Sequence, residues 1–138
     1  MNRLLFFLVI ICLGIYSCTK SDLRAQYYFM RSAATGDTIG RFYVHETEDA
    51  RVRMEWSLKN LMNDTLYAAR LRRGKANNPS DTLIEWGLLR TTGTTLKFEK
   101  TENYSFDDFR VADACFFLYG PYPLVSDAVV FANLGKNR

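Results

Sequence analysis

The densest group of chemically capable side chains in the sequence is a run of four cations, Arg70, Arg72, Arg73 and Lys75. Guanidinium groups bind phosphate through paired hydrogen bonds, so the run predicts an anion site for phosphate, a lipid headgroup or lipopolysaccharide. On an extended strand, Arg70 and Arg72 would project from one face and Arg73 from the other. The alternative interpretation is a solvated strand edge, where Lys and Arg discourage pairing with another chain.

Imidazole and thiol groups are scarce in this chain. His45 is the single histidine of the 138 residues, which is too few for a nucleophilic triad or a multi-imidazole metal site. Cys115 is the one cysteine after residue 18 and lies in the apolar run 112–119, which predicts a buried core thiol and no intrachain disulfide. The sequence has no phosphate-binding loop and no Cys-x-x-Cys pair. We therefore expect no catalytic residue, no metal and no cofactor.

Charge and length narrow the classes of function further. The chain has 18 Lys and Arg against 15 Asp and Glu, a net charge of +3. A nearly neutral chain of this size is not built to neutralise many phosphates, so we expect no nucleic-acid partner. A length of 138 residues with 48% hydrophobic residues predicts one folded domain.

The first 17 residues predict a signal peptide. Arg3 is followed by an uninterrupted apolar run over residues 4–15, and a polar segment over residues 19–22 comes directly after Cys18. A membrane-spanning helix needs about 20 apolar residues, so this run is too short to span a bilayer and has the length of a secretory signal.

The end of this segment, Ile15-Tyr16-Ser17-Cys18, resembles a bacterial lipoprotein signal (lipobox). Ile15 and Ser17 match the aliphatic and small positions of that signal, whereas Tyr16 is bulkier than the usual residue. The resemblance implies that Cys18 is diacylated and becomes the first residue of the mature protein, which would hold it on a membrane. We therefore expect a location in the bacterial cell envelope, at the outer membrane. The alternative is an ordinary cleaved signal peptide.

Alternation of apolar and polar residues predicts the elements that position these side chains. It is clearest in residues 50–58, where Val52, Met54, Trp56 and Leu58 alternate with polar residues, as on a half-buried strand. The same reasoning predicts strands over residues 26–31, 39–46, 50–58, 65–73, 81–89, 94–99, 112–119 and 126–134. One helical turn is expected over residues 104–109, capped by Ser105.

Eight short strands separated by turn residues predict an all-β fold, an antiparallel Greek-key β-sandwich. Among the turns, the segment 74–80 is expected to be a loop between two strands. The expected organisation is a signal peptide over residues 1–17, the lipidated cysteine and a tether over 18–25, and the β-sandwich domain over 26–138.

Two segments, 51–74 and 106–137, together resemble a β-sandwich family, the Cu/Zn superoxide dismutase-like and chordin-type (CHRD) domains, which include bacterial lipoproteins. The first segment has an alternating strand, a Leu-rich turn, a second strand and then Gly74. The second ends on Leu134-Gly135, as the last strand of that family does. The resemblance implies the sandwich fold.

The departures from that family bear on activity. Where the family has His-x-His, this sequence has Arg70-Leu71-Arg72, and where the family has Val-His it has Leu118-Tyr119. Arginine stays protonated and has no lone pair to donate to a metal. The resemblance therefore implies the fold of a dismutase without its metal ligands.

Aromatic residues are frequent, and some flank the expected strands. Tyr27, Tyr28 and Phe29 follow the tether, and Tyr119 and Tyr122 lie in or beside a loop. We expect such residues to close the ends of the sandwich core. The alternative is an exposed patch that binds a partner or a glycan.

The sequence as a whole predicts a non-enzymatic envelope lipoprotein that acts as a membrane-tethered binding or structural module. Its partners would be the membrane, through Cys18, and an unidentified envelope protein, lipid or glycan. The alternative is a degenerate dismutase-like enzyme or a metal-handling protein.

Overall fold

The computed structural model describes residues 23–137, and the alternating segments of the sequence form its strands. Each strand end lies within three residues of the expected one. The strands are β1 Ala25–Ser32, β2 Thr38–Glu46, β3 Val52–Leu58, β4 Leu66–Lys75, β5 Asn78–Arg90, β6 Leu96–Glu102, β7 Asp113–Tyr119 and β8 Ala128–Gly135. The predicted signal peptide over 1–17 and the predicted lipid site Cys18 lie outside the described residues.

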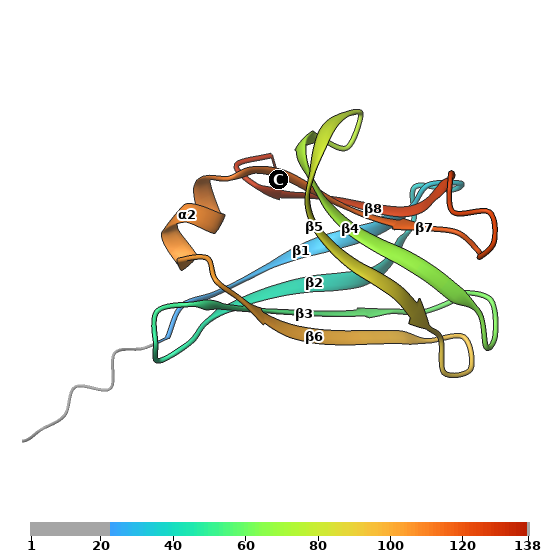
Figure 1. Cartoon of the computed structure of the whole chain (residues 1–138), viewed down its shortest axis with the longest axis horizontal. Helices are drawn as coiled ribbons and strands as arrows, with labels where there is room; N and C mark the ends of the chain where they lie inside the picture. The colour runs from blue at the N-terminus through green and yellow to red at the C-terminus, as the bar shows by residue number, and fades with distance from the viewer. Residues whose placement is uncertain (1–22, 138) are drawn as a thin grey trace, which may run out of the picture.

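All eight strands pair in antiparallel fashion in the order β5-β4-β7-β8-β1-β2-β3-β6. The strands β1, β2, β3 and β6 form one layer, and β5, β4, β7 and β8 form the layer that crosses it (Figure 1). The chain changes layer between β3 and β4, between β5 and β6 and between β6 and β7. The predicted antiparallel Greek-key sandwich is confirmed.

Aromatic rings fill the space between the layers. Trp56 of β3 is fully buried, and its ring centroid lies 4.2 Å from that of Phe98, 5.3 Å from that of Phe42 and 5.1 Å from that of Phe116. Phe116 belongs to β7, so these contacts hold the two layers together. The indole Nε1 of Trp56 is buried and has no hydrogen-bond partner among the described residues.

The two layers meet differently along their two sides. On one side β1 and β8 pair at only two positions, Arg31 with Phe131 and Ser32 with Val130. On the other side β5 and β6 end the sheet as its two edge strands. There Trp86 of β5 donates its Nε1–H to the Oε1 of Glu102 on β6, at 2.9 Å, so a side chain joins the layers where the backbone does not.

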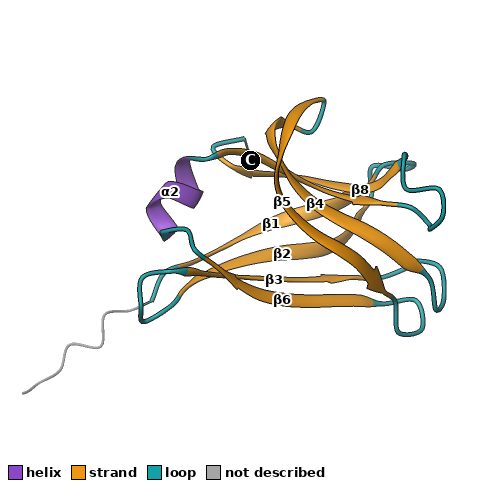
Figure 2. Ribbon diagram, viewed as in Figure 1, coloured by secondary structure: helices purple, strands orange, loops and turns teal. Residues whose placement is uncertain are grey.

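One short helix, α2 Phe106–Val111, closes an end of the sandwich (Figure 2). Ser105 caps it, because its Oγ accepts the N–H of Asp108 at 3.1 Å, as predicted. The buried Phe109 packs on the ring of Tyr28, with 6.3 Å between centroids, and on that of Phe42, at 6.5 Å. Two aromatic contacts therefore hold the helix against the core, one with a residue of β1 and one with a residue of β2.

The expected loop over residues 74–80 is wrong. β4 and β5 continue their pairing through Gly74 with Pro79 and Lys75 with Asn78, which leaves a tight hairpin. Gly74 has a φ of +94°, and a Cβ there would lie 2.7 Å from the carbonyl oxygen of Asn78. Glycine therefore lets the ladder shift its register and continue where the polar sequence suggested a loop.

Candidate functional site

The basic run places two of its four members around one tyrosine. Arg70 donates from Nε and Nη2 to the Oε1 of Glu85, at 3.1 and 3.0 Å, and its Cζ lies 5.3 Å from the ring centroid of Tyr119. Arg72 donates to the Tyr119 hydroxyl at 3.2 Å and to the carbonyl oxygen of Ser80 at 2.9 and 2.6 Å. The structure thus brings together Arg70, Arg72 and Tyr119 on the face of the sheet that points away from the core.

The other two cations of the run lie apart from this group. Arg73 pairs with the core residue Ala114, so it faces the opposite side of β4, and its side chain is exposed at the end of the sandwich. Lys75 is exposed at the β4–β5 hairpin. The anion site over these four residues stays a prediction, with its exposed charge concentrated at Arg73 and Lys75.

Cys115 lies beneath Arg72, in the ladder between β4 and β7. It is fully buried, and its thiol donates to the carbonyl oxygen of Arg72 at 3.7 Å. Burial raises the pKa of the thiol to about 11, against the opposing effect of the Arg72 charge. The expectation of a core thiol is confirmed, because a thiolate is disfavoured at this position.

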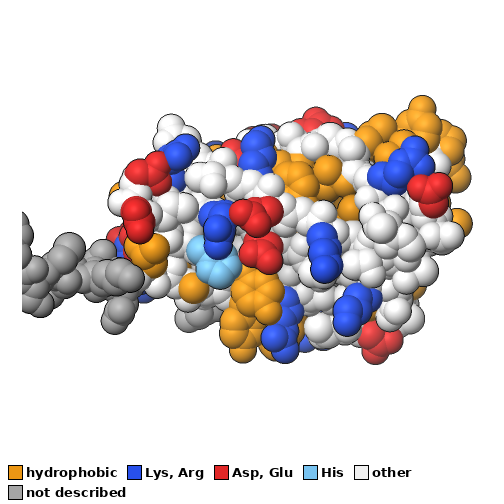
Figure 3. Space-filling model, turned by 90° about the horizontal axis from the view of Figure 1, so that it is seen from below, with side chains coloured by type: hydrophobic (Ala, Val, Ile, Leu, Met, Phe, Trp, Pro, Cys, Tyr) orange, Lys and Arg blue, Asp and Glu red, His pale blue; other side chains and the backbone are white. Residues whose placement is uncertain are grey.

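His45 lies on the outer face of β2, away from Cys115 and the basic run. Its ring stacks against Tyr43, with 6.0 Å between centroids, and its Nε2 is 3.9 Å from a carboxylate oxygen of Glu55. Figure 3 looks onto this side of the molecule, where acidic and basic side chains lie next to one another. Among residues 23–137, no three His, Cys, Asp or Glu side chains gather closely enough to hold a metal ion.

A different group joins the start of β1 to the rest of the domain. Arg24 bonds both carboxylate oxygens of Glu46, at 2.9 and 2.7 Å, and Asp107 of α2 at 2.7 Å. Its guanidinium also lies 4.8 Å from the ring centroid of Phe106. The hydrogen bonds from Arg24 lower the pKa of Glu46 to about 2. Arg24 therefore clamps the entering chain to β2 and α2.

An exposed aromatic patch covers the outer face of β1 and β2. Tyr27 and Phe29 are 54% and 47% exposed, their rings meet edge to face at 5.6 Å, and Tyr43 lies 6.2 Å from Tyr27. The Cζ of Arg41 lies 5.6 Å from the centroid of Tyr27 and 5.9 Å from that of Phe29. We call these four residues the aromatic patch.

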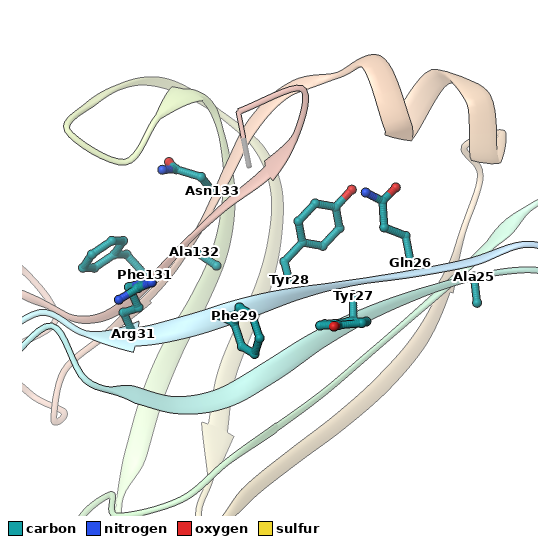
Figure 4. A pocket seen from close by; sticks show the side chains of 9 residues that line it. All are labelled: Ala25, Gln26, Tyr27, Tyr28, Phe29, Arg31, Phe131, Ala132 and Asn133. Carbon is teal, nitrogen blue, oxygen red and sulfur yellow. The ribbon is translucent and has the colours of Figure 1, made fainter.

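The expectation that the aromatic residues close the core holds for only part of the set. Tyr28 is 3% exposed and belongs to the core between the layers. Tyr119 is also buried, at 7% exposed, but on the outer face of the sheet. Tyr27, Phe29 and Tyr122 are 54%, 47% and 55% exposed. On β1 the two kinds alternate, because successive side chains of a strand point to opposite faces. Figure 4 shows Tyr27 and Phe29 on one side of the strand and Tyr28 on the other.

A groove of about 610 Å³ opens between β1 and β8, next to the aromatic patch (Figure 4). It begins where the two-residue pairing of these strands ends, and its volume is within the range of small ligand sites. Its lining residues are Ala25, Gln26, Tyr27, Tyr28, Phe29, Arg31, Phe131, Ala132 and Asn133. One lining residue is cationic and none is acidic.

The metal site implied by a dismutase-like fold does not fit these residues. The positions that the resemblance aligned with metal-binding histidines carry Arg70, Arg72 and Tyr119, which contact one another. A guanidinium has no lone pair for a metal, and it would repel a cation.

The arrangement of eight antiparallel strands and one short helix is similar in fold to solved superoxide dismutase-like proteins. Two solved structures share it: single and double mutants of a SOD-like protein from Bacillus subtilis, each with a TM-score of 0.51 and 11% sequence identity. The alignments cover 78% of this chain and 96% and 95% of those chains. No protein-family model and no curated protein sequence matches the chain.

Sequence reasoning missed the groove and the partners of the basic run. Glu85, Ser80 and Tyr119 reach Arg70 and Arg72 because β5 and β7 flank β4. β5 follows β4 through the hairpin, whereas β7 is distant in the sequence. The sequence did contain a signal for the aromatic patch, because β1 has apolar side chains on both of its faces. This pattern predicts that each face is either buried or binds a partner.

Proposed function

We propose that the protein is a non-enzymatic cell-envelope lipoprotein whose β-sandwich acts as a membrane-tethered binding module. The observation that carries the binding role is the aromatic patch, where Tyr27 and Phe29 are about half exposed beside a groove of about 610 Å³. Aromatic side chains exposed together are costly in water and are typical of surfaces that bind a partner.

The chemistry of the remaining groups supports a binding role over catalysis. The positions equivalent to metal ligands carry guanidinium groups that are hydrogen-bonded to Glu85, Ser80 and Tyr119. The one thiol of the described residues is buried, with a pKa raised to about 11. His45 has a carboxylate neighbour, but no hydroxyl or thiol nucleophile is bonded to it among residues 23–137.

The lipoprotein part of the proposal rests on the lipobox-like segment that ends at Cys18. No helix within residues 23–137 has the length and apolar character needed to cross a membrane. Arg24 of the clamp lies six positions after Cys18 in the sequence, a separation that spans at most about 22 Å when extended. An anchored domain would therefore sit next to the bilayer, with α2 and the β2–β3 hairpin at its membrane side.

Two measurements test the proposal separately. The full chain, expressed in a bacterial host, should partition into the detergent phase of a Triton X-114 extraction, and Cys18→Ala should move it to the aqueous phase. A Ser17→Ala control keeps a small residue before the cysteine and should still partition. Detergent partitioning that survives Cys18→Ala would refute the lipid anchor.

Metal analysis of the purified full chain tests the non-enzymatic part. We expect less than a tenth of an equivalent of copper or zinc after dialysis against either ion. One equivalent of bound metal with dismutase activity would support the alternative, a degenerate dismutase-like enzyme or metal-handling protein.

The predicted anion site is tested with vesicles of phosphatidylcholine containing anionic phosphatidylglycerol. If the basic run binds headgroups, Arg73→Ala and Lys75→Ala should weaken binding more than Arg70→Ala, because Glu85 already neutralises Arg70. Equal binding by all three variants and the native chain would remove this site from consideration.

A further inference from the structure

We propose that the groove between β1 and β8 binds an extended, acidic peptide segment of a partner protein, which adds to the edge of β1 as an extra strand. The inference rests on the proposed function of a binding module and names the site and the ligand class. It is carried by the direction of the backbone groups along β1, which the hydrogen bonds at both ends of the strand determine.

The backbone N–H and C=O groups of a strand point alternately to its two neighbours. The carbonyl oxygen of Arg24 accepts the N–H of Glu46 at 2.8 Å, so the even-numbered residues of β1 face β2. The N–H of Ala33 donates to the carbonyl oxygen of Val129 at 2.9 Å, so the odd-numbered residues face β8. The backbone groups of Ala25, Tyr27 and Phe29 therefore point into the groove.

Within the described part of the chain, these three residues have no strand partner on the groove side. The register of β1 with β8 contains only Arg31 and Ser32, whereas the register of β1 with β2 runs from Ala25 to Arg31. β1 is thus paired along one edge and open along most of the other. Its open edge is the arrangement that accepts a peptide by strand addition.

The facing edge of β8 is open in the same way. The N–H of Lys136 donates to the carbonyl oxygen of Ala112 at 3.1 Å, so the even-numbered residues of β8 face β7. Asn133 therefore presents its backbone groups toward β1, opposite Phe29 in a continued register. A guest strand would find backbone donors and acceptors on both walls of the groove.

Helix α2 keeps the groove from closing by ordinary pairing of β1 with β8. It packs against both β8 and β2 at the end where the strands separate. Its Phe109 lies 6.3 Å from the ring of Tyr28, which lines the groove from β1. For β1 and β8 to pair further, this buried aromatic contact would have to be displaced.

The charge beside the groove selects the ligand. Arg31 donates to the carbonyl oxygen of Gly36 at 3.2 Å, and Arg41 donates to the Tyr43 hydroxyl at 3.4 Å. Within residues 23–137 no carboxylate pairs with either guanidinium. Both are exposed, so a peptide with Asp or Glu at alternate positions would complete their interactions.

A glycan could stack on Tyr27 and Phe29, but it would leave the rest of the site unused. The backbone groups of Ala25, Tyr27 and Phe29 recur every second residue, about 6.6–6.8 Å apart, and another strand has the same repeat. An extended peptide matches this row, the exposed rings and the two cations together. The peptide is therefore the occupant that the geometry favours.

The first experiment is residue-resolved hydrogen exchange on the full chain in detergent. The amides of Tyr27 and Phe29 should exchange at least tenfold faster than those of Gln26, Tyr28 and Met30, because only the second set pairs with β2. Equal protection of all five amides would show that the edge is already paired, and would overturn the proposal.

The second experiment selects ligands from a phage-displayed library of random ten-residue peptides on the immobilised full chain. Selected peptides should carry acidic residues at alternate positions and should protect the amides of Tyr27 and Phe29. A copy of the best peptide with alternate backbone nitrogens methylated should bind at least tenfold more weakly. Selection of no binder, of binders that protect other residues, or of a peptide insensitive to methylation would overturn the proposal.

Variants separate this site from the rest of the surface. Phe29→Pro removes one groove-facing N–H and should weaken the selected peptide at least tenfold. If that variant unfolds, the charge reversal Arg31→Glu provides the same test, with Arg53→Glu on the outer face of β3 as a matched control that should leave binding unchanged. Equal weakening by Arg31→Glu and Arg53→Glu would reduce the effect to net charge and overturn the site.

The same hydrogen-exchange measurement with an oligogalacturonate, an anionic oligosaccharide, distinguishes an anionic glycan ligand from a peptide. Protection of the Tyr27 and Phe29 amides by this oligosaccharide, at concentrations where the selected peptide gives none, would make the groove a glycan site. Neither result bears on the detergent partitioning of the Cys18→Ala variant, so the lipid anchor and the peptide groove can fail independently.

Discussion

Trp56 should be the residue on which the cohesion of the two layers depends most. It is fully buried, and its ring contacts Phe98, Trp86 and Phe116, of which the last two belong to the opposite layer. Burying a tryptophan removes about 150–250 Å² from water, which at about 25 cal/mol per Å² is roughly 4–6 kcal/mol. We therefore expect Trp56→Ala to lower the free energy of unfolding by about 3–5 kcal/mol.

A second substitution at the same position tests the reasoning more finely. The Nε1–H of Trp56 has no partner among the described residues, so Trp56→Phe loses no hydrogen bond and keeps an aromatic ring. It should cost only about 1–2 kcal/mol. Tyr27→Ala is the matched control, because that ring is 54% exposed, and should change stability by about 0.5 kcal/mol or less.

The assay is urea denaturation followed by far-ultraviolet circular dichroism, since substituting a tryptophan alters fluorescence directly. A domain of this length has roughly 6–17 kcal/mol of stability, so Trp56→Ala should remain measurable, with an unchanged slope against urea. The reasoning would be refuted if Trp56→Ala cost less than about 1.5 kcal/mol. It would also fail if Trp56→Phe and Trp56→Ala were equally destabilising.

Three further predictions follow from individual contacts. Because Arg24 lowers the pKa of Glu46 from an ordinary 4.5 to about 2, this pair stabilises the fold above pH 4.5, and its contribution is lost as the pH falls toward 2. Arg24→Ala should therefore reduce the loss of stability between these pH values, and a pH–denaturation series of both proteins that ran in parallel would contradict it. Gly135→Ala should be severely destabilising in thermal denaturation, because its φ is +60° and a Cβ would collide with the Ala112 carbonyl oxygen; the control Gly36→Ala, with φ +77° and open space around it, should cost only about 1 kcal/mol. The Cys115 thiol should react with Ellman's reagent only in denaturant, since burial raises its pKa to about 11. Cys115→Ala identifies its signal, and rapid labelling of this thiol in the folded protein at pH 7.5 would contradict the prediction.

Local pattern predicted much of the fold because alternation decides which face of a strand is buried. The residues Val52, Met54, Trp56 and Leu58 are all fully buried, as their spacing indicates. The cap at Ser105 was equally predictable, because a helix start needs only neighbouring residues. The hairpin over 74–80 was not predictable in this way, since its polar residues favour a loop. The β4–β5 ladder continues there through Gly74, which adopts a positive φ.

The candidate site was harder to predict because it depends on contacts between distant parts of the chain. Arg72 meets Tyr119 across 47 positions of sequence, and nothing near either residue signals the other. On β1, apolar residues occupy both faces, so pattern alone could not tell that Tyr28 enters the core and Tyr27 does not. The opening between β1 and β8 lies where α2 packs against Tyr28, and both features exist only in the assembled sandwich.

The Arg24 clamp also determines how mechanical load would enter the domain. A pull on the N-terminal segment acts first on the bonds from Arg24 to Glu46 and Asp107, and so on β2 and α2 before the rest of β1. β1 then bears the load through a seven-position ladder with β2, whereas its two-position pairing with β8 carries little of it. A pull that broke the clamp would thus be resisted by shear along β1 and β2, while the groove side of β1 stayed free to move.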